Sequence, residues 1–481
     1  MNKSVNLIYG VKDKPGIWKT IVFALQQVLA ILAATIVVPV IVGNGLSQSA
    51  ALFGAGVGTI VYLLFTRFRS PVFLGSSFAF IGSMSAAFAG ATSASAGYLG
   101  IIIGAILAGL VYVVIALIIK AAGVNWIDKI MPASVIGPTV AIIGLSLSVN
   151  AVGDLFKGSV TKPVTDAVIK FNDAGIPYLD SVTNFVPTAN IWLCLLCGLI
   201  TLATVIVCSV YGKKMMKIIP FIIGILAGYA VAAIFTAIGH LTDNETLMII
   251  NFGLFKDMKW RPDFTFVEAF KGFKDIDAAF IGTIAVAYVP VAFVVFAEHL
   301  ADHKNISSII GTDLTRDPGL HRTLLGDGVG SMVGAFFGGC PNTTYGESVG
   351  CVAISGNASV VTIFATAIIC IVAAFVAPFV TFLATIPSCV MGGVCVALYG
   401  FIAVSGLKMI QKVDLSQNHN LFTVSSVLIA GVGGMVVNIG AVTITSVACA
   451  LILGIIVNVI SGPAVKKEQA AKLENAQTEK E

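Results

Sequence analysis

Charged residues are scarce in this chain of 481 residues. Asp, Glu, Lys and Arg make up only 11% of it, whereas 57% of the residues are hydrophobic and the mean hydropathy is +0.98. Soluble domains carry about 25% charge, so the composition excludes a water-soluble globular enzyme. The net charge of +4 is small, and Lys and Arg lie at the ends of apolar runs, so no nucleic-acid partner is expected.

Cysteines in a disulfide or metal-binding pattern are also lacking. Most of the nine cysteines fall in or against apolar runs, where free Cys behaves as a small hydrophobe. Cys194 and Cys197 form a C-x-x-C pattern without polar partners, which favours packing in an apolar helix over a metal or redox site. No nucleophile with a matching base appears either. We therefore expect no metal, no cofactor and no enzymatic activity.

Long apolar runs dominate the chain instead. The first nineteen residues are polar and make a poor secretory leader, so the first span is expected to stay attached. Apolar windows and their Gly, Pro and charged breaks predict an all-α polytopic membrane protein with fourteen spans. The predicted spans lie near residues 20–42, 50–66, 72–90, 98–120, 131–150, 189–211, 217–240, 276–298, 322–338, 344–356, 359–384, 390–407, 420–438 and 442–461.

Positive charges fall on alternate short loops. Lys and Arg are absent from one set of these loops, at 43–49, 91–97, 385–389 and 438–442. Since Lys and Arg near span ends are retained in the cytoplasm, we predict a multi-pass protein of the cell membrane with both termini cytoplasmic. Two longer mixed-charge segments then lie outside, at 151–188 and 241–275, and the polar tail is either frayed or a short surface helix.

Two stretches of the chain resemble each other. LFGAGVGTIVYLLF at 52–65 aligns without a gap with LLGDGVGSMVGAFF at 324–337, an offset of 272 residues. Ser76, Ser77 and Phe78 match Thr343, Thr344 and Tyr345 at an offset of 267, and Pro132, Val135 and Gly137 match Pro387, Val390 and Gly392. These matches predict two inverted repeats of seven spans, with a binding site near the midplane. The glycines of both stretches are expected to permit close helix packing.

Spans 3 and 10 are interrupted at corresponding places. FLGSSFAF follows Pro71, and NTTYGES follows Pro341, with only about ten apolar residues after it. Non-helical backbone survives inside a membrane only where it lines a cavity. We therefore predict two short antiparallel strands that meet there, each leading into a half-helix. The first amide N–H groups of the half-helices would then point at one place and bind acceptor groups.

Few ionisable residues lie in the predicted spans, and each is a functional candidate because burying it is costly. Glu298 ends an apolar run in AFVVFAEHLADH, and Asp302, four residues later, shares its helix face. The alternative for Glu298 is a structural residue paired to a helix neighbour, and the alternative for Asp302 is a solvated cap near the cytoplasmic helix end. His299 and His303 lie on neighbouring faces and are secondary candidates, since interfacial histidines are common.

The second interruption has an acid of its own. Glu347 follows Tyr345 and Gly346 and could reach the same cavity as Glu298. Asp327 in GDGVG is a secondary candidate, expected to bond to a hydroxyl of the neighbouring broken span. Ser77 and Ser348 are secondary candidates too. Phe78 and Tyr345 occupy matching positions beside the two interruptions, so they are predicted to wall a flat slot, with plain packing as the alternative.

Carboxylates, amide N–H groups and aromatic walls favour a small planar heterocycle with ring N–H donors and carbonyl acceptors. No Lys or Arg lies at the interruptions, which disfavours an anionic cargo and leaves a cationic one open.

At these residues the chain resembles the nucleobase/ascorbate transporter family, in its bacterial uracil-carrying branch, over about residues 15–462. The resemblance rests on QQVLAILAATIVVPV at 26–40, FLGSSFAFI at 73–81, AEHLADH at 297–303, RDPGLHR at 316–322 and PNTTYGESVG at 341–350.

The resemblance implies a core of spans 1–4 and 8–11 and a gate of spans 5–7 and 12–14. The implied segments are a cytoplasmic N-terminal segment at 1–16, core parts at 17–123 and 276–386, gate parts at 124–275 and 387–462, and a cytoplasmic tail at 463–481. It also implies that Glu298 and Glu347 hydrogen-bond the base, that Phe78 and Tyr345 contact its ring, that Gly346 supplies backbone donors and that Ala34 lines the slot. Proton coupling through Glu298 and Asp302, and a homodimer joined through the gate, are implied as well.

Two departures from the family pattern bear on the substrate. Asp302 stands where the uracil branch often has His, and Ser348 and Ser355 replace a usual Asn and Thr. Glu347 still favours the uracil branch, because purine-carrying relatives commonly have Gln there. The resulting hypothesis is a secondary transporter in the lipid bilayer that imports uracil with a proton by alternating access. A xanthine or uric acid symporter and a nucleobase channel are the alternatives, and sodium coupling stays open.

Overall fold

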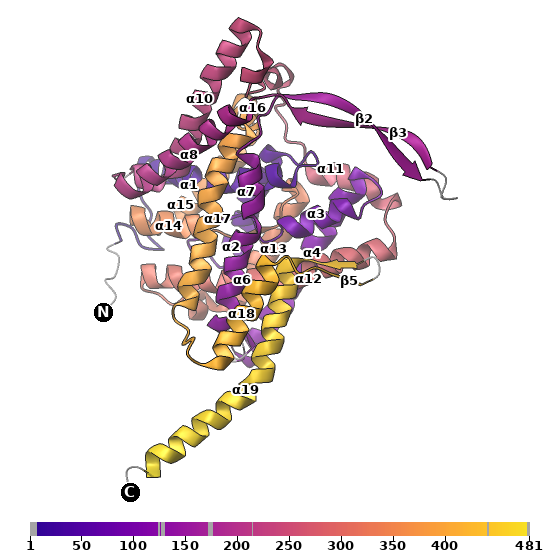
Figure 1. The fold of residues 1–481 in the computed structure, drawn as a ribbon. Coiled ribbons are helices and arrows are strands. Elements are labelled where there is room, and N and C mark those ends of the chain that lie inside the picture. Colours follow the sequence, from indigo (N-terminus) through magenta and orange to yellow (C-terminus); the bar gives the residue numbers. More distant parts are fainter. Residues whose placement is uncertain are drawn as a thin grey trace. The chain divides into compact units, whose positions relative to one another are not determined.

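The computed structural model describes residues 7–123, 126, 130–171, 177–213, 215–439 and 442–478, and Figure 1 draws its helices and strands. Within these residues, eight helices are long and apolar enough to cross a membrane. A ninth span is formed if α15 (Val360–Ala373) and α16 (Ala377–Thr385), which are bent by 85°, count as one. The chain is therefore a mostly helical, multi-pass membrane protein. Parts of the predicted N-terminal segment, outer loop at 438–442 and tail lie outside the described residues.

Each predicted span coincides with helical structure. The eight spanning helices are α1 (Ile17–Val42), α2 (Gln48–Phe65), α4 (Ala94–Ala122), α6 (Ala133–Ser146) continued by α7 (Ser148–Asp154), α8 (Ile191–Tyr211), α10 (Pro220–Thr242), α12 (Ala278–Ile310) and α17 (Ser388–Ile410). The remaining long helices are α13 (Leu320–Gly338), α18 (Asn418–Val432) and α19 (Ser446–Thr478). Two helices extend well beyond their predicted ends. Helix α12 continues from the predicted end at residue 298 to Ile310, and its His299 and His303 are buried. Helix α19 continues from the predicted end at residue 461 to Thr478.

Polar side chains fix where several helices begin. Ser47 accepts a hydrogen bond from the amide of Ala50 at the start of α2, and Ser93 accepts one from Ala96 at the start of α4. Asp277 does the same for Phe280 at the start of α12. Such caps satisfy amides that have no partner inside the helix.

The two interrupted spans each contain a short strand followed by a short helix. Strand β1 (Leu74–Ser76) precedes α3 (Ile81–Ala89), and β4 (Asn342–Thr344) precedes α14 (Gly346–Ser355). The strands pair antiparallel, with Gly75 opposite Thr343. At ~1.5 Å per residue, helices of nine and ten residues cover about half of a ~30 Å hydrocarbon layer. The prediction of two strands that meet and lead into half-helices is therefore confirmed.

Glycines bring α2 and α13 close together, as predicted. A β-carbon built on Gly58 would lie 2.8 Å from the carbonyl oxygen of Gly330, and one built on Gly330 would lie 2.9 Å from that of Gly58. Real side chains do not tolerate these distances, so the backbones approach as closely as only glycine permits. This contact joins the two helices that precede the paired strands in the chain.

The chain divides into two compact units. The first comprises Met1–Ser148, Trp260–Val380 and Leu398–Glu481 and contains the strand pair β1–β4. The second comprises Val149–Lys259 and Thr381–Ala397. In the second unit, a hairpin of β2 (Thr161–Phe171) and β3 (Pro177–Pro187) occupies the segment for which only an outer loop was expected. A further strand pair, β5 (Val437–Ile439) with β6 (Val442–Ile444), lies before α19 in the first unit.

Candidate functional site

The acidic face of α12 lies against the second interruption. Thr344 Oγ1, on β4, donates a 2.8 Å hydrogen bond to Asp302 Oδ2. A β-carbon built on Gly346 would lie 3.9 Å from Asp302 Oδ1, so this carboxylate also lies beside the first residue of α14. Glu298 is partly buried one turn earlier, within electrostatic range of Asp302 and Glu347. Asp302 is therefore partly buried against β4 and lies well before the end of α12 at Ile310, so the alternative of a helix end was wrong.

The start of α14 supplies an acid and amides that have no carbonyl acceptor in a preceding helical turn. Glu347 lies in the first turn and is partly buried, whereas Gly346 is exposed. The first backbone hydrogen bond of this helix is donated by the amide of Val349 to Tyr345 O, at 3.2 Å. The amides before it have no acceptor within the helix. Among the described residues, neither Glu347 nor Glu298 forms an ion pair with Lys or Arg.

The two aromatic candidates have different surroundings. Tyr345 is buried, its ring covers the Cα of Gly75, and its hydroxyl donates a 2.8 Å hydrogen bond to Ser76 O on the paired strand. Phe78 is partly exposed and meets the ring of Tyr399 edge-on, with centroids 5.7 Å apart. Their role as walls of a slot stays a prediction. Ala34 is buried in α1, which contacts both β1 and α14.

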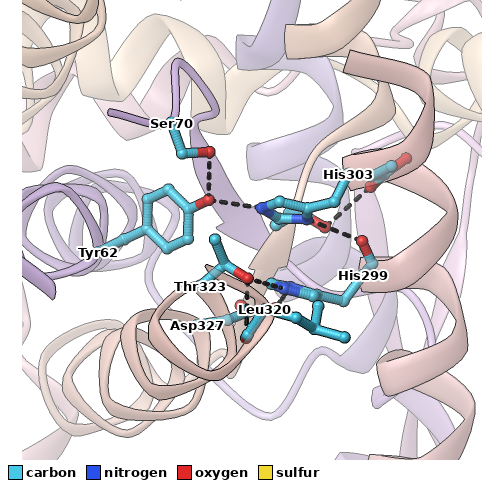
Figure 2. A network of polar contacts seen from close by, with 9 residues as sticks. Tyr62, Ser70, His299, His303, Leu320, Thr323 and Asp327 are labelled. Atoms are coloured by element: carbon cyan, nitrogen blue, oxygen red, sulfur yellow. Dashed lines mark hydrogen bonds and ion pairs between the residues drawn. The ribbon is translucent and has the colours of Figure 1, made fainter. Parts of the chain in front are cut away.

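Both histidines of α12 belong to a buried polar network with Asp327, shown in Figure 2. His299 Nδ1 lies 2.7 Å from Asp327 Oδ2, and its Nε2 lies 3.0 Å from Thr323 Oγ1. His303 Nε2 lies 2.7 Å from the hydroxyl of Tyr62. All five residues have 0% exposure. Two expectations were therefore wrong: Asp327 bonds to an imidazole rather than to a hydroxyl of the broken span, and neither histidine is interfacial.

The two serine candidates are also buried. Ser348 Oγ accepts hydrogen bonds from Gln27 Nε2 at 2.5 Å and from the amide of Phe73 at 3.1 Å. This hydroxyl therefore ties α1 to the segment that leads into β1. The amide N–H of Ser77 donates a 2.9 Å hydrogen bond to Pro341 O. The hydroxyl of Ser77 has no hydrogen-bond partner among the described residues.

Three residues of this region were missed by the sequence reasoning. Gln27 and Thr344 make the contacts just described, and Asn342 Nδ2 donates a 3.0 Å hydrogen bond to Gly54 O. Gln27 was detectable as a polar residue in the middle of an apolar run. Thr344 and Asn342 carried no comparable signal, because hydroxyl and amide residues are common wherever a chain turns.

The arrangement combines hydrogen-bond acceptors and donors at one place. Three carboxylates on α12 and α14 can accept from N–H groups of a solute, and the first amides of α14 can donate to its carbonyl oxygens.

A model of the Permease family matches residues 18–440. The chain belongs to this family.

Relatives of this permease extend over nearly its whole length. The uracil permease of Bacillus subtilis (strain 168) is 36% identical over 473 residues, which cover 97% of this chain and 98% of the relative. The uracil permease of Bacillus caldolyticus is 37% identical, and the match covers 96% of this chain and 95% of the relative. That of Escherichia coli (strain K12) is 33% identical and covers 93% and 92%. The family resemblance predicted from the motifs is therefore confirmed, and these relatives are transporters rather than enzymes.

Solved structures of membrane transporters share the fold of this permease. The transmembrane domain of a cyanobacterium bicarbonate transporter, BicA, matches with a TM-score of 0.56 at 14% identity, over 93% of this chain and 99% of that one. Murine Slc26a9, an anion transporter in the inward-facing state, matches with a TM-score of 0.62 at 12% identity, over 93% of this chain and 69% of that one. Identities this low establish the fold alone.

Proposed function

We propose that the chain is a secondary active transporter that imports uracil together with a proton. In this proposal, Glu347 and the amides at the start of α14 bind the base, and Tyr345, Phe78 and Ala34 line its slot. Glu298 accepts a ring N–H, and Glu298 or Asp302 carries the proton. Ring N–H groups of uracil match the carboxylates, and its carbonyl oxygens match the amides.

The observation that carries the proposal is the group of three partly buried carboxylates around the start of α14. Thr344 joins Asp302 to β4, and Glu298 and Glu347 lie within electrostatic range of each other. Carboxylates in a low-dielectric site without a cationic partner take up protons readily. A group of acids that also accepts hydrogen bonds from the solute links proton binding to solute binding. The relatives named uracil permease support the choice of base.

Uptake of labelled uracil into proteoliposomes tests the proposal. We expect accumulation when an inward proton gradient is imposed and none with a sodium gradient alone. Glu298→Gln should lose most of the gradient-driven accumulation while keeping the size and shape of the side chain. Accumulation that follows sodium, or that is unchanged in Glu298→Gln, would contradict the proton-coupling assignment.

We further propose fourteen spans in two inverted repeats, with spans 3 and 10 being the β1–α3 and β4–α14 segments. At the repeat offset of 272 residues, Gly58 corresponds to Gly330, and these two glycines contact each other reciprocally. Equivalent residues touch only where a two-fold axis passes between them. The antiparallel pairing of the equivalent strands β1 and β4 supports the same axis.

The remaining architecture follows the family resemblance. We propose cytoplasmic termini in the cell membrane, a core and a gate that move relative to each other, and a homodimer. The second compact unit lies almost entirely within the segments assigned to the gate. This supports the assignment of spans 6 and 7 to a gate that is separate from the core. Trp18, in α1, is 78% exposed. Labelling of a Trp18→Cys variant from each side of the membrane would show on which side the first span begins.

A xanthine or uric acid symporter is the alternative that one observation favours. Asp302, bonded to Thr344, adds an acceptor that a purine with more N–H groups could use. Unlabelled xanthine that competes with labelled uracil as well as uracil itself does would favour this alternative. A nucleobase channel would equilibrate uracil without concentrating it. Anion exchange, as in transporters of similar fold, is disfavoured by the three carboxylates.

A further inference from the structure

The AEHLADH motif of α12 contains two acid–histidine pairs, Glu298–His299 and Asp302–His303, spaced by four residues. At ~100° per residue, the two acids form one stripe along the helix and the two histidines form the adjacent stripe. The acidic stripe lies beside β4 and α14, as described above. The imidazole stripe makes a different set of contacts, all of them buried.

His299 is held at both ring nitrogens by α13. Thr323 donates its hydroxyl to Leu320 O at 3.0 Å, so its oxygen accepts from His299 Nε2–H. His299 Nδ1 and Asp327 Oδ2 then share one proton across 2.7 Å, because two lone pairs cannot approach so closely. Both ring nitrogens of His299 therefore have a partner on α13, which fixes the orientation of the ring.

His303 is held in the same way by a different helix. Its Nδ1–H donates to His299 O in the preceding turn at 2.8 Å, so its Nε2 accepts from the Tyr62 hydroxyl of α2 at 2.7 Å. Ser70 in turn donates to Tyr62 at 2.6 Å. The two imidazole rings stack with centroids 4.0 Å apart, and Figure 2 shows Tyr62 and Thr323 pointing toward them. A rotation of α12 would leave several buried polar groups without partners.

We propose that His299 and His303 are positioning residues, which fix the rotation of α12 so that Glu298 and Asp302 face the start of α14. Each anchored histidine directly follows the acid that it orients. In this proposal neither histidine touches the solute; both act through the orientation of α12. This inference rests on the proposed function, because its effect is measured through uracil binding.

The anchors can be removed without changing α12. Thr323→Val removes the hydroxyl that accepts from His299 and keeps the shape of the side chain, whereas Thr323→Ser restores the hydroxyl. Tyr62→Phe removes the hydroxyl that donates to His303. Tyr112→Phe is its matched control, because Tyr112 is buried, its ring meets that of His299 at 6.4 Å, and its hydroxyl has no protein partner among the described residues.

The dissociation constant of uracil and the melting temperature are measured for each purified full-length variant. We expect Thr323→Val and Tyr62→Phe each to weaken uracil binding about 10-fold, as loss of a buried hydrogen bond that orients the site would do. Thr323→Ser and Tyr112→Phe should stay within about 2-fold of the wild type. This pattern, including rescue by Ser, would support the positioning role.

Unchanged uracil affinity in Thr323→Val and Tyr62→Phe would overturn the inference, whether or not the melting temperature falls, because a network that only stabilises the fold leaves the affinity of folded protein intact. Equal weakening in Tyr112→Phe would overturn it too, since any change near the rings would then suffice. Failure of the wild type to bind uracil would instead overturn the proposed function, and the inference with it.

Discussion

The two interrupted spans have the same backbone plan and different chemistry. At the repeat offset of 267 residues, Ser77 corresponds to Thr344, Phe78 to Tyr345 and Phe80 to Glu347. Phe80 is buried and stacks on Tyr288, with centroids 5.5 Å apart, whereas Glu347 is a partly buried acid at the start of α14. Thr344 and Tyr345 make hydrogen bonds through their hydroxyls, and Ser77 makes none with a described residue.

This comparison teaches that two segments with the same backbone plan, equivalent in the proposed repeat, need not carry the same side chains. The backbone of both interruptions is dictated by the strand pair, because each strand satisfies the hydrogen bonds of the other. Side chains outside the strands are free to differ. In the proposed site, the polar groups that bind the base lie at the second interruption, whereas the first contributes packing. Four substitutions, from the largest expected effect to the smallest, test this asymmetry.

Glu347→Ala should have the largest effect. It removes a carboxylate proposed to accept from the base, and hydrogen bonds to charged groups contribute about 1.5–3 kcal/mol. Uracil affinity should therefore fall about 10- to 100-fold, measured by equilibrium binding to purified protein. Phe80→Leu is the control at the corresponding position of the first interruption and should keep near-normal affinity. Wild-type affinity in Glu347→Ala would contradict the site assignment.

Thr344→Val should come next. The substitution keeps the shape of the side chain and removes the donor to Asp302 Oδ2, which leaves a partly buried carboxylate oxygen without this partner. We expect about a 10-fold loss of proton-driven uracil uptake. Thr344→Ser should restore most of it. If uptake in Thr344→Val matches that of the wild type, Asp302 is not oriented by β4.

Tyr345→Phe should have a moderate effect. Loss of the hydrogen bond to Ser76 O costs about 1 kcal/mol, so the melting temperature should fall by a few degrees. Uracil affinity should fall by about 5-fold or less, because the ring itself is retained. If the substitution lowers the free energy of uracil binding more than the free energy of unfolding, the hydroxyl contacts the base directly.

Ser77→Ala should have the smallest effect. Its hydroxyl makes no hydrogen bond to a described residue, so its removal should change uptake less than about 2-fold. Uptake kinetics over a range of uracil concentrations would measure this. A loss as large as that of Thr344→Val would show that the first interruption contributes to the site as much as the second, and the asymmetry would be wrong.

The broken spans were predictable because a membrane leaves the backbone few choices. Gly and Pro residues with hydroxyls inside apolar runs indicated breaks at FLGSSFAF and NTTYGES, and a strand pair was the simplest way to satisfy their hydrogen bonds. The hairpin β2–β3 was not predicted, because it lies in a polar segment where no such constraint applies. The end of α12 was misplaced because hydropathy treats His299 and His303 as boundary residues, although both are buried.

The sequence by itself determined the membrane class and which acids stand beside the strand pair, because placing a charge or an unpaired backbone group in hydrocarbon is costly whichever residues surround it. Only the tertiary structure decided what each polar group contacts. Asp327 was expected beside a hydroxyl of the broken span, yet it shares a proton with His299, which lies 28 residues earlier. A hydrogen bond depends on distance and direction between two helices, and helix packing sets both.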